Sequence, residues 1–186
     1  DELFYCCNCL SIIDIPNSVT NIGSSAFREC SGLTSVVIPN SVISIGSYAF
    51  SNNNNLNNIT IPNSVISIGY KAFNGCNEKL YTKLDGIKYI DNWAVDVVHN
   101  SIISANIKPL TRGIAGGTFY NCCNLTNVTM PNSLITVGSG AFEQCFELMD
   151  IVLPYGVINI EDSAFSSCWS LSNIEIPNSV TNIGAS

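Results

Sequence analysis

Residues 33–50 read LTSVVIPNSVISIGSYAF, and this unit returns along the chain with a fixed period. The prolines of its I-P-N-S-V motif, or of close variants of it, are separated by 23 residues or by three times 23. They are Pro16, Pro39, Pro62, Pro131, Pro154 and Pro177. A strict period of this length is the sequence signature of a solenoid, in which each repeat forms one rung of a stack.

Three further columns keep the same period. Phenylalanine recurs at Phe4, Phe27, Phe50, Phe73, Phe119, Phe142 and Phe165. Cysteine follows three residues later in most rungs, at Cys7, Cys30, Cys76, Cys122, Cys145 and Cys168. A leucine or isoleucine comes three residues after that. Because stacked strands lie about 4.8 Å apart, the columns predict ladders along the axis, with the phenylalanine rings as a spine.

Each repeat contains signals for two short extended runs and one turn. β-branched residues dominate Leu33–Ile38, which favours a strand, and Pro39 ends it because proline has no N–H to donate. Val42 and Ile45 predict a second extended run, and Gly46 permits a turn. A one-turn helix or 3₁₀ turn is expected next. The predicted fold is a solenoid of about eight rungs with short parallel strands.

The composition excludes some partners. Charged residues make up 11% of the chain and the formal net charge is −7, so no basic stripe is present for nucleic acid or for an anionic membrane. No stretch approaches the ~18 apolar residues of a spanning helix. We expect residues 1–186 to form a single solenoid, cut from a longer array because both ends interrupt a repeat.

The unit at Leu33–Phe50 resembles the 23-residue leucine-rich repeat of BspA-like surface proteins of the Treponema pallidum type. The proline, the I-G pair, the A-F pair and the cysteine all fall in register. This resemblance implies a right-handed leucine-rich repeat superhelix in a secreted or cell-surface protein. It further implies adhesion to a host matrix or plasma protein, with no cofactor and no enzymatic activity.

Residues 80–98 lack the repeat signature. They contain Asp85-Gly86 and Asp91-Asn92 between short apolar runs, which predicts a β-meander. The segment resembles the hairpin insertion of bacterial members of the family and is expected to replace one repeat. We expect Tyr89 and Trp93 to be exposed there as binding residues, with the alternative that Trp93 covers the core where the rung is missing.

Outward positions of the predicted strands are the main candidate binding residues, since solenoids commonly bind partners on such faces. We expect one continuous exposed sheet, and the alternative is a solvated polar face. The candidates are Asp14, Val37, Asn58, Thr60, Asn106, Asn127, Thr129, Val152 and Glu175.

The cysteines and the single histidine do not predict a catalytic or metal site. Six of the nine cysteines occupy one column, which favours buried thiols over disulfides, while a Cys6–Cys9 bridge stays open. His99 falls in the cysteine column, but a line of stacked residues does not provide four tetrahedral zinc ligands. No nucleophile, base and orienting group are grouped.

Three functions follow as hypotheses. The first is an adhesion module that binds a host or matrix protein through its exposed sheet. The second is a structural spacer that presents another domain and has no ligand of its own, which the near-identical, charge-poor units favour. The third is carbohydrate binding on a polar sheet with aromatic neighbours.

Overall fold

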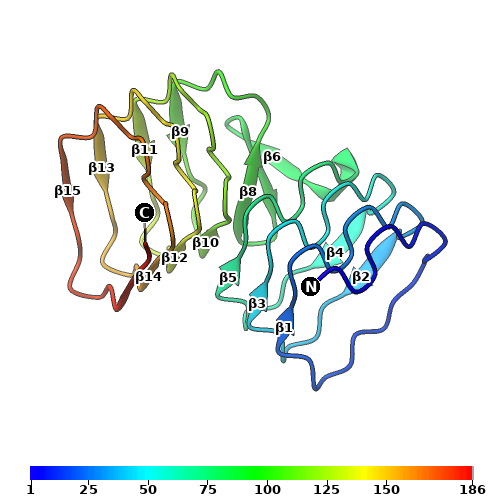
Figure 1. Cartoon of the computed structure of the whole chain (residues 1–186). Helices are drawn as coiled ribbons and strands as arrows, with labels where there is room; N and C mark the ends of the chain where they lie inside the picture. Colours follow the sequence, from blue (N-terminus) through cyan, green and yellow to red (C-terminus); the bar gives the residue numbers. More distant parts are fainter. Residues whose placement is uncertain (186) are drawn as a thin grey trace.

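The computed structural model describes residues 1–185, and these wind into a solenoid (Figure 1). Most rungs contribute a front strand before the proline and a shorter back strand before the glycine. The front strands are β2 (Ser35–Val37), β4 (Asn58–Thr60), β9 (Ser104–Asn106), β11 (Asn127–Thr129), β13 (Asp150–Val152) and β15 (Asn173–Glu175). The back strands are β1 (Asn21–Ile22), β3 (Ser44–Ile45), β5 (Ser67–Ile68), β10 (Gly113–Ile114), β12 (Thr136–Val137), β14 (Asn159–Ile160) and β16 (Asn182–Ile183).

Strands of successive rungs pair in parallel with a constant register. Ser35 pairs with Asn58 on the front, and Ser44 pairs with Ser67 on the back. Both steps equal one sequence period. The central residue of each three-residue front strand faces inward and its neighbours face outward, as in the exposed-buried-exposed pattern of β11. The expected solenoid of stacked rungs is confirmed.

The phenylalanine spine is also confirmed. Ring centroids of Phe27 and Phe50 lie 5.3 Å apart with planes 11° from parallel, and those of Phe142 and Phe165 lie 5.4 Å apart. Within residues 1–185, no stacked pair joins Phe73 to Phe119. The hydrophobic core accordingly consists of two clusters, and both include side chains of residues 80–98, such as Trp93 in one and Tyr89 in the other.

The segment after each glycine forms tight turns, which differs from the one-turn helices or 3₁₀ turns expected there. The N–H groups of Tyr48, Phe50 and Asn52 donate to carbonyls of the next rung, at 2.9, 2.8 and 2.8 Å. Tyr48 and Asn52 take positive φ angles of 56° and 61°. Because these N–H groups bond between rungs, they are not available for a helical ladder. The helix found in the described residues is a 3₁₀ turn, η1 (Glu78–Leu80).

The cysteine column contains free thiols. All nine cysteines lie within the described residues and none is bonded to another, so the Cys6–Cys9 bridge left open above is not formed. The thiols of Cys30 and Cys76 donate to the carbonyls of Phe4 and Phe50 in the preceding rung, at 2.9 and 3.1 Å. These thiols therefore hydrogen-bond the backbone of the phenylalanine column in addition to packing in the core.

Residues 82–97 form an antiparallel meander of β6 (Thr82–Leu84), β7 (Ile87–Ile90) and β8 (Trp93–Val97). β8 also pairs in parallel with β10, so the meander continues the back sheet of the C-terminal rungs. Tyr89 is 0% exposed and Trp93 is 3% exposed. The expectation that Tyr89 and Trp93 form an exposed binding surface is therefore wrong: both rings fill the core where a regular rung is absent.

The front sheet is divided at the meander, which corrects the expectation of one continuous exposed sheet. β2 and β4 form one sheet, named here the N-terminal front sheet, and β9, β11, β13 and β15 form the C-terminal front sheet. Between them, Asp91 accepts from the Ile61 N–H at 2.7 Å. The Tyr89 hydroxyl accepts from the Lys108 N–H at 3.1 Å. Side chains of the meander thus satisfy donors that a missing strand would otherwise pair.

The turn side of the solenoid continues past the meander. The Gly116 N–H donates to Ile68 O at 2.8 Å, and the Lys71 N–H donates to Gly116 O at 2.9 Å. Figure 1 shows the two arrays of rungs offset from one another on either side of β6 and β8. The meander therefore separates the front strands of the two arrays, while their turn segments remain hydrogen-bonded to each other.

Candidate functional site

All nine predicted residues of the outward strand positions are exposed, but they belong to two separate surfaces. The N-terminal front sheet and the isolated bridge beside it carry Asp14, Val37, Asn58 and Thr60. The C-terminal front sheet carries Asn106, Asn127, Thr129, Val152 and Glu175. The structure does not bring the two groups together, because the meander lies between β4 and β9.

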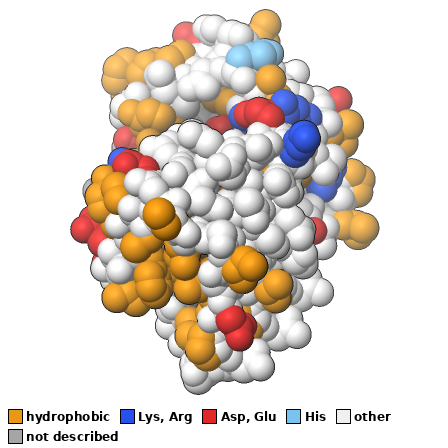
Figure 2. Space-filling view, turned by 90° about the vertical axis from the view of Figure 1, so that its right-hand side faces the viewer, with side chains coloured by type: hydrophobic (Ala, Val, Ile, Leu, Met, Phe, Trp, Pro, Cys, Tyr) orange, Lys and Arg blue, Asp and Glu red, His pale blue; other side chains and the backbone are white. Residues whose placement is uncertain are grey.

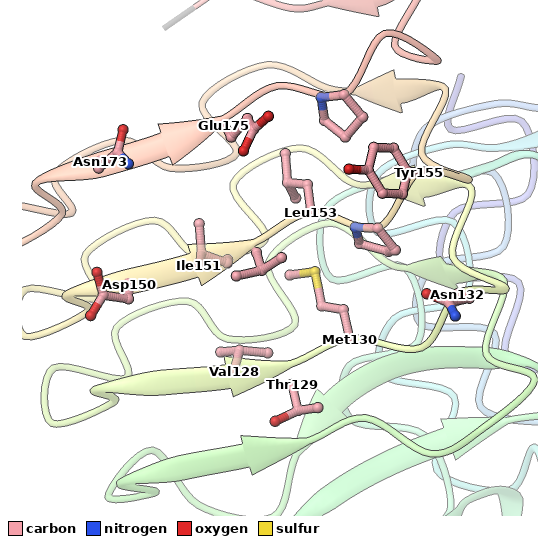
Figure 3. A pocket seen from close by; sticks show the side chains of 13 residues that line it. Val128, Thr129, Met130, Asn132, Asp150, Ile151, Leu153, Tyr155, Asn173 and Glu175 are labelled. Carbon is pink, nitrogen blue, oxygen red and sulfur yellow. The ribbon is translucent and has the colours of Figure 1, made fainter.

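A groove of about 630 Å³ lies over β11, β13 and β15. We name it the C-terminal groove. It brings together three predicted residues with several that the sequence analysis did not select. Its lining includes Thr129, Met130, Asp150, Val152, Tyr155 and Glu175. In Figure 3, Asp150 and Asn173 lie at one end, Tyr155 and Asn132 at the other, and Glu175 and Met130 in between.

Tyr155 is the aromatic residue of the groove lining, and its side chain is 86% exposed. It follows Pro154 at a position that is asparagine in the other proline-containing motifs, as at Asn40 and Asn132. The rung reads LPYGV where the repeat reads IPNSV. This departure from the motif is the sequence signal that distinguishes Tyr155. The periodic columns do not include it, because they select residues that recur.

The floor and rim of the groove combine apolar and acidic groups. Val152 is 79% exposed, Met130 is half-buried, and Asp150 and Glu175 are exposed. Ion pairs in the described part of the chain involve Arg28, Lys71, Lys83 and Lys88, but neither of these carboxylates. The groove therefore presents two carboxylates without a cationic partner beside exposed apolar surface.

A second, smaller hollow lies over the back strands β14 and β16 and reaches β5. Its central group is Glu161, whose Oε2 accepts from the Ser139 N–H at 3.1 Å. Burial raises the pKa of Glu161, while hydrogen bonds from Ser67 and Ser139 act in the opposite direction. Since internal donors already engage this carboxylate, we assign it a structural role where the two arrays meet.

The meander carries a local charge cluster. Glu78 binds Lys83 at 2.6 Å and Lys88 at 3.0 Å, and hydrogen bonds from both lysines lower the pKa of Glu78. Figure 2 shows most Lys and Arg side chains of this face gathered at the upper right beside Asp and Glu, not spread as a stripe. The lysines are thus largely engaged within the meander.

Aromatic side chains on the turns are a further feature that periodicity did not reveal. Tyr70 makes edge contacts with Tyr48 and Tyr120, each with centroids 5.7 Å apart. Phe146 and Trp169 stack at 4.4 Å, and Trp169 is 78% exposed. Trp169 lies on the turn that precedes β15, four residues before Asn173.

Residues 1–185 contain no group of three or more His, Cys, Asp or Glu side chains able to hold a metal ion. His99 is exposed, and its Nδ1 lies 3.0 Å from the Ser101 hydroxyl. Over the same span, no helix is long and apolar enough to cross a bilayer.

The family model described as BspA type leucine rich repeat region matches residues 1–109 and 112–186 in six copies. No curated protein matches the chain. Among solved structures, the pneumococcal vaccine antigen PcpA is 25% identical with a TM-score of 0.57, and the match covers 95% of this chain and 47% of PcpA.

Two other solved structures are similar in sequence. A leucine-rich repeat protein from Bacteroides ovatus is 27% identical with a TM-score of 0.45, over 94% of this chain and 48% of that one. A leucine rich cell surface protein from Faecalibacterium prausnitzii is 25% identical with a TM-score of 0.43, over 100% of this chain and 62% of that one. The chain thus spans about half the length of the Bacteroides protein and of PcpA.

Proposed function

Because the chain belongs to the BspA-type leucine-rich repeat family, we propose that it is a non-catalytic adhesion module that binds a host or matrix protein. The binding surface is the C-terminal front sheet, and the protein acts outside the cell, secreted or at the cell surface. Leucine-rich repeat solenoids are protein-binding scaffolds, and the likeness to PcpA supports this class of function.

The observation that carries the proposal is the C-terminal groove. It is lined by residues that depart from the repeat, among them Met130, Leu153 and Tyr155. Binding specificity needs side chains that differ between rungs, and tyrosine is one of the residue types enriched at binding hot spots. Here an exposed tyrosine, an exposed valine and two carboxylates meet on one face.

The division of the front sheet makes a matched test available. Thr129 and Thr60 occupy equivalent outward positions, but Thr129 lines the groove and Thr60 lies in the N-terminal front sheet. We expect Thr129→Arg to abolish binding to a panel of matrix and plasma proteins, fibronectin and fibrinogen included. Thr60→Arg should leave it unchanged, because it adds the same side chain to the other surface.

Label-free binding with both variants, and far-UV circular dichroism to verify folding, measures this outcome. Equal losses in the two variants would place binding on a different surface. Flat traces for the wild-type chain on every protein would contradict adhesion through this segment. A glycan array with hits that Thr129→Arg removes would favour the carbohydrate hypothesis.

One observation favours the spacer as a second candidate. Residues 15–23 and 176–184 are identical, IPNSVTNIG, although they lie near opposite ends of the described chain. Rungs of constant sequence present a constant surface, which suits a support more than a recognition site. A spacer would give flat traces in the panel while each variant keeps wild-type stability.

A further inference from the structure

We propose that the C-terminal groove selects an extended protein segment in which a lysine or arginine lies two residues from an apolar residue, so that both side chains face the groove. This rests on the proposed function and adds the chemistry of the partner.

The C-terminal rungs are acidic and almost without cations. From β9 onward, residues 104–186 contain six Asp and Glu side chains and two cations, Lys108 and Arg112. The Lys108 ammonium donates to Asp91 O of the meander at 2.8 Å. Arg112 donates to Asn63 O at 2.7 Å and to Asn63 Oδ1 at 3.3 Å, so it contacts the N-terminal array and not the groove. A basic partner would therefore meet a complementary field on this half of the molecule.

Two carboxylates are placed to share one cation. Val152 pairs with Glu175 and Asp150 pairs with Asn173 across β13 and β15. Asp150 and Glu175 hence lie on neighbouring strands, two residues apart along the strand direction, with roughly 8 Å between Cα atoms. Both are exposed on the same face. A guanidinium or ammonium group between them reaches either carboxylate with a charge-assisted hydrogen bond.

The apolar part of the groove suits the stem of the same side chain. Val152 lies directly beside Glu175 in the strand register, and Tyr155 presents its ring beyond Pro154 (Figure 3). Lysine and arginine bury their methylene stems on apolar surface and keep the charged end near polar groups. An aromatic face adds a cation–π contact. An apolar residue two positions from the cation shares its face of the extended segment and packs on Met130 and Val152.

The chain offers variants that separate this chemistry from general electrostatics. Glu175→Gln removes one groove charge. Glu147→Gln removes a charge from the same array at an exposed residue that does not line the groove. Tyr155→Asn restores the asparagine of the repeat motif. Gly156 is kept, because a Cβ atom there would lie 2.8 Å from Asn132 O.

The experiment measures binding of capped peptides with the pattern Xaa-Thr-Val-Thr-Xaa, in which Xaa is Arg, Lys, Gln or Glu, so that Xaa and Val share one face of the extended peptide. We expect saturable binding of the Arg and Lys peptides and none of the Gln and Glu peptides. The affinity should fall as salt is raised. Glu175→Gln should lower it about tenfold, the loss of one charge-assisted contact, and Tyr155→Asn should lower it similarly. Glu147→Gln should stay within about twofold.

Equal binding of the Gln and Arg peptides, or equal losses in Glu147→Gln and Glu175→Gln, would overturn the proposal. So would absence of binding by every peptide at low salt. Fibronectin or fibrinogen binding that Thr129→Arg abolishes and Glu175→Gln leaves intact would keep the adhesion function while removing the preference for a basic segment. Concentration-dependent dimerisation of the chain that Glu175→Gln abolishes would instead identify a second copy, through its meander lysines, as the occupant.

Discussion

At the residue scale, the cysteine column has a specific role that its hydrophobic character alone does not explain. Four thiols of the column, those of Cys30, Cys76, Cys145 and Cys168, donate to a phenylalanine carbonyl of the preceding rung, as Cys145 does to Phe119 O at 3.2 Å. Burial raises the pKa of Cys76 to about 12, so its thiol remains protonated, and a donor, at neutral pH. Alanine in this column would leave a buried carbonyl short of a partner, which is costly.

Asn53 takes the place of a cysteine in this column and provides a test. Its Nδ2 donates to Phe27 O at 2.8 Å and to Phe50 O at 2.6 Å, but its Oδ1 is buried without a partner. Asn53→Cys should raise the free energy of unfolding by about 1 kcal/mol. The thiol of the new cysteine replaces the amide as donor to Phe27 O. Phe50 O still accepts from the Cys76 thiol, and the unpaired Oδ1 of Asn53 is no longer present.

Urea unfolding followed by circular dichroism, under reducing conditions, measures this change. Asn53→Ala is the control, since it also removes Oδ1 but leaves Phe27 O without this donor. A stability of Asn53→Cys equal to or below that of Asn53→Ala would show that the hydrogen bond of the column contributes nothing.

At the element scale, the meander is the feature that shapes the molecule. β8 pairs with β10, with Gly113 opposite Trp93 and Ile114 opposite Ala94. A Cβ atom on Gly113 would overlap the Trp93 ring. The indole therefore packs directly on backbone, and a glycine at this position permits the junction between the inserted strands and the regular rungs.

Gly113→Ala should destabilise the protein by about 1–3 kcal/mol, the usual cost of overpacking. The Gly113→Ala, Trp93→Leu double variant should recover part of that loss, because the smaller side chain leaves room for the methyl group. Thermal unfolding of the wild type, both single variants and the double variant gives the coupling energy. Additive effects of the two substitutions would rule out the contact as the cause.

The meander also decides where the candidate site lies. By separating β4 from β9, it restricts any extended ligand on the C-terminal groove to the C-terminal front sheet. The side chains that seal the gap, Asp91 and Tyr89, come from the meander itself. A partner strand is thus not needed to satisfy the Ile61 and Lys108 N–H groups.

At the scale of the whole molecule, successive regular rungs on the same side of the meander contact each other through the front strands, the back strands and the turns. Stability should therefore be close to a sum over rungs and their interfaces. Deletion of residues 38–60, one full period, joins Val37 to Ile61 and keeps every column in register. We expect a folded protein of reduced stability with unchanged binding at the C-terminal groove.

Circular dichroism and size-exclusion chromatography measure this result. The matched control is deletion of residues 38–49, about half a period, which moves Phe50 into the position of Ile38 and should abolish folding of the N-terminal array. A half-period variant with native-like spectra would contradict the stacking of columns.

The period of the sequence was sufficient to predict much of the fold. Residues 23 apart stack, so inward positions such as Val36 and Ile59 and outward positions such as Thr60 and Thr129 follow from one repeat. The phenylalanine spine follows for the same reason. For the candidate site, the periodic columns provided Thr129, Val152 and Glu175, but not Tyr155, which breaks the motif.

The sequence by itself determined the solenoid, its rung-to-rung register and the alternation of core and surface, because a fixed period maps each residue onto fixed neighbours. Only the tertiary structure decided that Tyr89 and Trp93 are buried, that the front sheet is divided and that tight turns replace helices. The first two features depend on the space that the meander fills, and the meander lies outside the repeat, so the period does not specify its packing. The third depends on which carbonyl of the next rung each N–H reaches, and the period fixes the neighbouring rung but not the backbone conformation.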